Sequence, residues 1–270
     1  MPIRYYVNLD CEPRRELGEG ELLELLAKRE RAQSVQARFR EEHGLEDTAR
    51  MRFREKTATP SGQRVTRETT VAEVLEECRP LGMHARHCES CPAALQGTAY
   101  SCTQSISIPI SAEAEGWLVR QVAPEGSQAF ALFRDAVERQ GYGKGGRFAN
   151  WRKGGFLKAD RPVTEKRGEF ILTSDQVLNA LLLVGDIMPP HGLGVLVHLQ
   201  ALRSTEGHTG DELLALMEGV SQSGSAEDAP EIEFALSPEK GEDASITELK
   251  FFLYAVYRAL SLEVPLALRL

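Results

Sequence analysis

The residues best suited to chemistry are four clustered cysteines, Cys78, Cys88, Cys91 and Cys102. Cys88 and Cys91 form a C-x2-C pair, and both thiolates of such a pair can reach one ion from a single tight turn. A tetrahedral site needs two further nitrogen or sulfur ligands, and Cys78 and Cys102 lie at similar distances on either side. The spacing therefore predicts a zinc ion held by four cysteines, within a Cys-rich module over residues 71–104.

Other ligand sets remain open within the same module. His84 or His87 could replace one cysteine, or could lie outside the site as an exposed or supporting side chain. Four thiolates also suit an iron–sulfur cluster. A Cys88–Cys91 redox couple is a further alternative, although the thioredoxin-like strand–helix–strand setting is missing.

Two further interpretations concern catalysis and the fifth cysteine. A catalytic zinc would need an open position and a nearby carboxylate, for which Glu76, Glu77 and Glu89 are candidates. Cys11 lies far upstream and is interpreted as an ordinary buried thiol.

A basic, aromatic loop or hairpin over residues 141–169 is the second candidate site. Its stretch 142–169 carries eight bases against three acids, and its aromatic rings alternate with cations. Such a surface could bind a protein partner or single-stranded nucleic acid. An alternative is a surface hairpin whose aromatics anchor it to the core. The residues predicted to contact a partner are Lys144, Arg147, Trp151, Arg152 and Lys153.

Three common catalytic motifs are not supported. Residues 141–146 match G-x-G-x-x-G, but a helical pattern precedes them, where a dinucleotide fingerprint requires a strand. Residues 219–224 do not form a G-x-S-x-G nucleophile elbow. His191 and His198 lack H-E-x-x-H spacing and are interpreted as packed or hydrogen-bonded histidines.

Charge is unevenly distributed along the 270 residues, whose formal net charge is −8. Residues 205–248 hold twelve acids and a single lysine, opposite in sign to the basic segment. The acidic total disfavours nonspecific nucleic-acid binding, because affinity for phosphates depends on positive fields. The two segments could attract each other within the fold or between copies of the chain.

The N-terminal residues and the apolar stretches predict a cytoplasmic protein that does not interact with membranes. No basic segment precedes an apolar core at the N-terminus, as a secretory signal would require. Charges, prolines and glycines interrupt the most apolar stretch, 177–199. In such a compartment cysteines are usually thiols or metal ligands.

Hydrophobic periodicity and turn residues predict an ordered series of elements. The predicted strands are 3–9, 51–57, 64–70, 106–110, 156–158, 169–172, 231–236 and 266–270. The predicted helices are 21–42, 71–78, 111–120, 127–139, 173–188, 191–202, 211–218 and 245–262. A Ser, Gly and acid-rich stretch over 221–230 is predicted to be a flexible connection.

Strands at both ends with helices between them favour an α+β fold in one domain, 1–270. We expect helices packed on a small mixed sheet, with the two termini paired and the Cys-rich metal segment attached. The function predicted is non-enzymatic, a binding, adaptor or regulatory protein stabilised by structural zinc and acting on a protein partner. The alternatives are a metalloenzyme, an iron–sulfur or thiol redox protein, and a nucleic-acid-binding protein.

Overall fold

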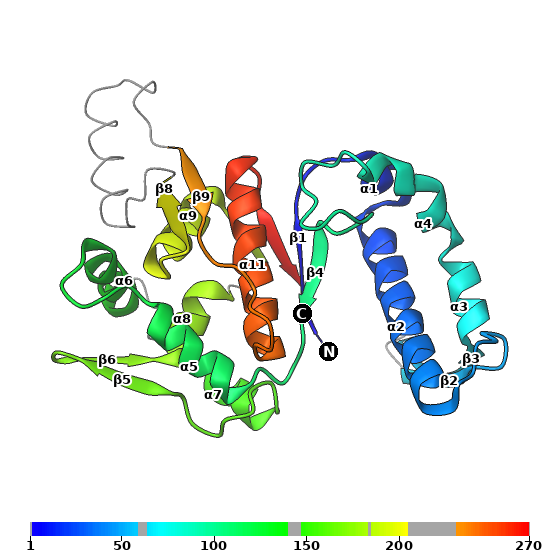
Figure 1. Cartoon of the computed structure of the whole chain (residues 1–270), viewed down its shortest axis with the longest axis horizontal. Coiled ribbons are helices and arrows are strands. Elements are labelled where there is room, and N and C mark those ends of the chain that lie inside the picture. Colours follow the sequence, from blue (N-terminus) through cyan, green and yellow to red (C-terminus); the bar gives the residue numbers. More distant parts are fainter. Residues whose placement is uncertain (1, 59–63, 140–146, 183–184, 205–230, 270) are drawn as a thin grey trace. The chain divides into compact units, whose positions relative to one another are not determined.

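The computed structural model describes residues 2–58, 64–139, 147–182, 185–204 and 231–269 (Figure 1). These residues form two compact units. One unit is continuous, Asp10–Tyr100. The other joins Met1–Leu9 to Ser101–Leu270. Each unit is described by itself below.

A four-stranded sheet forms the centre of the discontinuous unit, in the order β4-β1-β10-β7. The N-terminal strand pairs with the C-terminal strand, as the sequence predicted, with Tyr5 opposite Leu268. All the pairings of this sheet are antiparallel, so the prediction of a mixed sheet was wrong on this point. Long excursions of chain separate the paired strands, so hydrophobic patterns could not set their directions. The strands are β1 (Ile3–Val7), β4 (Thr103–Ile106), β7 (Gly185–Ile187) and β10 (Leu266–Arg269).

Helix α11 (Ala244–Ser261) covers this sheet, as Figure 1 shows, and contacts β1, β4 and β10. The Tyr5 ring meets the Phe252 ring edge-on at 5.1 Å between centroids, and both side chains are fully buried. Helix α9 (Pro189–His198) packs on α11 through Gly192, where an added Cβ would lie 3.1 Å from Val256. Glycine at this position therefore permits the close approach of the two helices.

The remaining described elements of this unit are helices and two small antiparallel sheets of two strands each. Helix α5 (Ala112–Gln121) packs on α8 and α11, and α6 (Gln128–Arg139) packs on α9. Thr173 and Gln176 form a capping box at the start of α8. The other bounds are α7 (Arg147–Lys153), α8 (Ser174–Leu181), β5 (Thr164–Arg167), β6 (Phe170–Thr173), β8 (Leu202–Ser204) and β9 (Ile232–Phe234).

The continuous unit is built on the long helix α2 (Glu19–His43), which ends at Gly44 in the left-handed conformation. Helix α3 packs on α2, and its capping box begins at Thr70, one of the two threonines, Thr69 and Thr70, that the sequence offers as caps. Strands β2 and β3 form the predicted hairpin. The other bounds are α1 (Glu12–Leu17), β2 (Arg52–Ala58), β3 (Arg64–Thr70), α3 (Val71–Glu77), α4 (Arg79–His84) and the 3-10 helix η1 (Ala85–Cys88).

Two small apolar clusters hold the continuous unit together. One surrounds Leu25, Cys78 and Tyr100, and the other surrounds Met51 and Val74. The first cluster includes the cysteine region, so burial of apolar surface there depends on how that region folds.

Several element predictions were wrong. Helix α7 lies in a stretch expected to be a loop or hairpin. Residues 156–158 and 169–172 are predicted from the sequence to be the two strands of a hairpin, but β6 pairs with β5. The spacing of Ser245 and Glu248 is typical of a capping box, but the last helix begins at the Asp243 cap. Glu248 instead accepts hydrogen bonds from the amide and hydroxyl of Ser107 at 2.6 and 2.8 Å. The predicted helix 211–218 and the connection 221–230 lie outside the described residues.

Among the described residues, no helix is both long enough and apolar enough to cross a membrane.

Candidate functional site

The Cys88–Cys91 pair lies in a tight turn that follows η1. The amide of Cys91 donates to the carbonyl of Cys88 at 3.3 Å, and the amide of Ala94 donates to that of Cys91 at 3.0 Å. Both thiols are half-buried and free. A hydrogen-bonded turn of four residues brings its first and last Cα atoms within about 7 Å, so both side chains start from nearly the same place.

The surroundings of Cys88 act on its ionisation in both directions. Burial raises the pKa of the Cys88 thiol, and the neighbouring charges of Cys91 and Cys11 raise it further. The backbone N–H of Tyr100 and the guanidinium of Arg29 favour the thiolate and oppose that rise. Burial is the largest of these effects, so the pKa of the Cys88 thiol is raised on balance.

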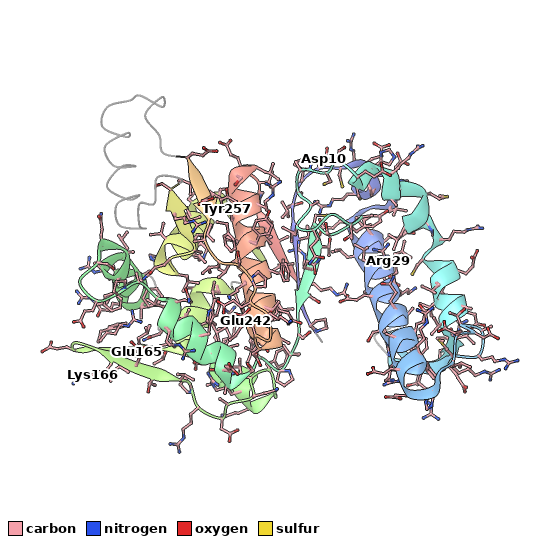
Figure 2. All side chains as sticks on the ribbon, in the orientation of Figure 1. Asp10, Arg29, Glu165, Lys166, Glu242 and Tyr257 are labelled. Atoms are coloured by element: carbon pink, nitrogen blue, oxygen red, sulfur yellow. The ribbon has the colours of Figure 1, made fainter. Side chains whose placement is uncertain are left out.

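Tyr100, the last residue of the continuous unit, is fixed beside this turn by several contacts. Its backbone lies in the left-handed region, at φ 65°, which is uncommon for a residue with a side chain. Its buried hydroxyl donates to the carbonyl of Leu81 at 2.6 Å, and the Arg29 guanidinium lies 5.1 Å from its ring centroid. Figure 2 labels Arg29, which projects from α2. These contacts determine where the Tyr100 amide lies relative to Cys88.

Cys11 was interpreted from the sequence as an ordinary buried thiol, but the structure leaves it partly exposed. It caps the start of α1, is half-buried, and lies close enough to Cys88 for their charges to interact. Helix α1 contacts η1 and α4, which brings the distant segment to the cysteine turn. One signal was available: the cap position before Glu12-Pro13 usually carries Ser, Thr, Asp or Asn, and here it carries cysteine.

Cys78 and Cys102 have different surroundings. The Cys78 side chain is 4% exposed in the first apolar cluster, and its thiol donates to the carbonyl of Leu25 at 3.4 Å. Cys102 belongs to the discontinuous unit, where its carbonyl accepts from the amide of Val7 at 3.1 Å. The structure thus places Cys78 among apolar side chains and Cys102 in the other unit, apart from the Cys88–Cys91 turn.

The two candidate histidines lie on the same stretch of chain. His84 ends α4 and is half-buried, whereas His87 lies in η1 and is exposed. Their ring centroids are 6.3 Å apart. Within the described part of the chain, no three or more His, Cys, Asp or Glu side chains are spaced so that they could hold a metal ion. The metal site therefore stays a prediction.

In the basic aromatic segment, Arg152 makes its hydrogen bonds and ion pairs inside the discontinuous unit. Its guanidinium donates to Glu115 and Asp175, to the carbonyl of Ala159 at 2.7 Å and to the hydroxyl of Ser174 at 3.2 Å. The side chains of Arg152 and Glu115 are 4% and 0% exposed. Burial lowers the pKa of Arg152, but the hydrogen bonds and charges of the two carboxylates outweigh it and raise the pKa. This side chain joins α5, α7 and α8.

Arg147 and Trp151 are also held by internal contacts. Arg147 donates to the carbonyl of Leu182 at 2.6 Å, and its guanidinium lies about 5 Å from the Phe148 and Trp151 rings. Burial lowers its pKa. The Trp151 ring stacks on Phe156 at 5.2 Å between centroids. The rings therefore pack on one another, which is the anchoring arrangement considered as the alternative to a binding surface.

Arg167 donates hydrogen bonds to backbone carbonyls at the end of α5. Its guanidinium donates to the carbonyls of Val119, Val122 and Ala123, at and beyond the last turn of α5. The bases of this segment that are exposed among the described residues are Lys153, Lys158, Arg161 and Lys166. Figure 2 shows Lys166 on the β5–β6 hairpin. Lys144 and the G-x-G-x-x-G stretch lie outside the described residues.

The two histidines interpreted as packed make backbone contacts. His191 Nε2 lies 3.0 Å from the carbonyl oxygen of Ala180, and His198 Nδ1 lies 3.2 Å from that of Ala129. Burial lowers the pKa of His198 to about 4, and the charge of His191 adds to that effect. His198 is therefore neutral at pH 7.

Comparison with known proteins adds no relative. No family model, curated protein or solved structure matches the chain. The functional argument consequently depends on the residues described above.

Proposed function

We propose that the Asp10–Tyr100 unit binds a structural zinc ion through the Cys88–Cys91 turn, and that the protein acts by binding a protein partner rather than by catalysis. The observation that supports this most is the turn itself, because its two sulfur atoms start from neighbouring positions. The Tyr100 amide beside Cys88 adds support, since N–H donors stabilise a coordinated thiolate. Zinc held by such ligands can contribute on the order of 10 kcal/mol to folding.

A bound ion would add stability that apolar burial supplies only weakly in this unit. Its two apolar clusters are small, and the segment from η1 to Tyr100 buries few large apolar side chains, Leu95 and Tyr100 being the largest. A metal would link this segment to the helices at a point where apolar burial alone contributes little. The partner surface is proposed to use the exposed cations of the basic segment, because its arginines 147, 152 and 167 already have internal partners.

Metal analysis of the purified full-length chain tests the zinc proposal. We expect about one equivalent of zinc and no visible absorption, with zinc lost from Cys88→Ser and Cys91→Ser. Ser90→Ala changes the same turn without removing a thiol and should retain the metal. Iron with visible absorption would favour the iron–sulfur alternative, whereas five titratable thiols and no bound metal after zinc loading would refute the proposal.

Charge reversal tests the partner surface. We expect a fluorescent acidic peptide to bind the wild-type chain more weakly as salt rises, and to lose affinity for a Lys153→Glu, Lys158→Glu double variant. An uncharged exposed change, Ser261→Ala on α11, is the matched control. Binding of oligo-dT in preference to the peptide would instead favour the nucleic-acid alternative, and binding of neither would remove this surface from consideration.

A further inference from the structure

The turn that carries Cys88 and Cys91 continues the geometry of a 3-10 helix. Helix η1 ends at Cys88, and Glu89 keeps right-handed helical backbone angles, φ −62° and ψ −35°. The amide of Cys91 then donates to the carbonyl of Cys88 at 3.3 Å, which is the hydrogen bond that defines this helix type. Side chains three residues apart in a 3-10 helix lie one above the other. Both cysteine side chains therefore leave the backbone on the same side of the turn.

The spacing of the two cysteines suits a disulfide bond. A 3-10 helix rises by about 2 Å per residue, so Cα atoms three residues apart are separated by about 6 Å. Disulfide-bonded cysteines have Cα atoms about 4.4–6.8 Å apart. Both thiols are free in the structure. A bond between the two sulfur atoms would therefore need little movement of the backbone.

The turn is also open to small molecules. The two thiols are half-buried, and the intervening residues Glu89 and Ser90 and the following Pro92 are exposed. Cys78 differs, because its side chain is 4% exposed and its thiol donates to the carbonyl of Leu25. A small reagent can therefore reach the turn, whereas the apolar cluster protects Cys78.

A bond across this turn would add little to the stability of the fold. The stabilisation that a disulfide provides grows with the number of residues in the loop that it closes. Residues 88–91 form a loop of only four residues. The pair is therefore better suited to a reversible change of oxidation state than to a permanent cross-link.

We infer that Cys88 and Cys91 form a reversible dithiol–disulfide couple that reduces small disulfides of the oxidised-glutathione class. One cysteine thiolate attacks a sulfur atom of oxidised glutathione, forms a mixed disulfide and displaces one glutathione thiolate. The other cysteine thiolate attacks the protein sulfur of the mixed disulfide and displaces the second glutathione thiolate. Two electrons pass from the cysteine pair to glutathione, and the two thiol protons end on the two glutathione molecules released.

This couple does not depend on the proposed zinc ion. The same two sulfur atoms can bind an ion or each other, but not both at once. The oxidation is therefore measured with a chelator present, so that bound metal does not compete with it. The second step is intramolecular, and the closeness of the two thiols favours it over reaction with another chain.

Intact-mass measurement after treatment with oxidised glutathione tests the inference. A full-length chain carrying Cys11→Ser and Cys102→Ser keeps only the thiols of the turn and the buried Cys78. We expect this chain to become lighter by two hydrogen atoms. After denaturation a single thiol, that of Cys78, should react with iodoacetamide, and prior treatment with dithiothreitol should restore all three.

Two variants of that chain serve as controls. Adding Cys91→Ser leaves Cys88 without its partner, so the reaction should stop at the mixed disulfide and the chain should become heavier by one bound glutathione. Adding Ser90→Ala changes the same turn but keeps both thiols, so the intramolecular disulfide should still form. Circular dichroism verifies that each variant is folded.

The outcomes are distinct from those of the zinc measurement. A mixed disulfide that persists in the chain with both Cys88 and Cys91, or an unchanged mass, would overturn the inference. A disulfide that includes Cys78 would overturn it as well. A chain that forms the Cys88–Cys91 disulfide but binds no zinc would support the couple and refute the proposed zinc function.

Discussion

Replacement of Arg152 by methionine should destabilise the discontinuous unit strongly, although the sequence predicted Arg152 to contact a partner. The change keeps most of the side-chain volume but removes the cation between Glu115 and Asp175. Glu115 is completely buried, so its carboxylate would remain without a counter-charge. Breaking a buried pair in this way costs about 3–5 kcal/mol. Domains are typically stable by about 5–15 kcal/mol, so this is a large fraction of the total.

Urea unfolding followed by tryptophan fluorescence measures this effect. The two tryptophans, Trp117 and Trp151, both belong to the discontinuous unit, so the signal reports on that unit alone. Lys153→Met is the matched control, because the neighbouring Lys153 is exposed and its loss should change stability by less than about 0.5 kcal/mol.

A double variant adds a sharper criterion. Glu115→Gln combined with Arg152→Met removes the stranded charge, and it should recover about 1–3 kcal/mol relative to the sum of the single changes. The loss in Arg152→Met should also persist in high salt, because buried charges are poorly screened. If Arg152→Met costs no more than Lys153→Met, the ion pair is not structural and Arg152 becomes available to a partner.

Three further predictions concern other parts of the chain. Burial lowers the pKa of His198 from 6.5 to about 4, so as pH falls His198 takes up its proton in the unfolded chain before it does so in the folded chain. The free energy of unfolding should therefore drop by up to about 3 kcal/mol between pH 6.5 and 4. A His198→Gln variant should lack that pH dependence in urea titrations. Tyr100→Phe should cost about 1–2 kcal/mol, because the buried Leu81 carbonyl loses its donor; hydrogen exchange should quicken within Asp10–Tyr100 and stay unchanged in the other unit. Asp243→Ala should lower the thermal midpoint by removing the α11 cap, a loss of about 1 kcal/mol, and Asp243→Asn should restore most of it.

Local signals in the sequence predicted part of the fold. Thr70 was one of two residues proposed as the cap of α3, and the strands predicted at both termini pair across the sheet. Helix α7 was missed because its seven residues follow a glycine-rich stretch and carry little apolar periodicity. Its position depends on Arg152 reaching Glu115 and Asp175, contacts between residues far apart in sequence that no local pattern encodes.

The sequence likewise predicted only part of the candidate site. Spacing alone revealed the C-x2-C pair, because a turn of four residues is a local structure. The packing of α1 against η1 joins segments that are far apart in the sequence, so no local spacing could predict it. Cys78 has a suitable spacing, but a helix delivers it to the apolar cluster instead.

The pairing of the first strand has a consequence for synthesis. β1 lies between β4 and β10, and its register joins Tyr6 to Thr103 on one side and to Ala267 on the other. A chain emerging from the ribosome therefore exposes β1 long before β10 exists, while Asp10–Tyr100 can already form its own contacts. The sheet is completed only when the last few residues have been made. Truncation at residue 262 should therefore leave the Asp10–Tyr100 unit folded, and it should expose the edge of β1 that normally pairs with β10 to self-association.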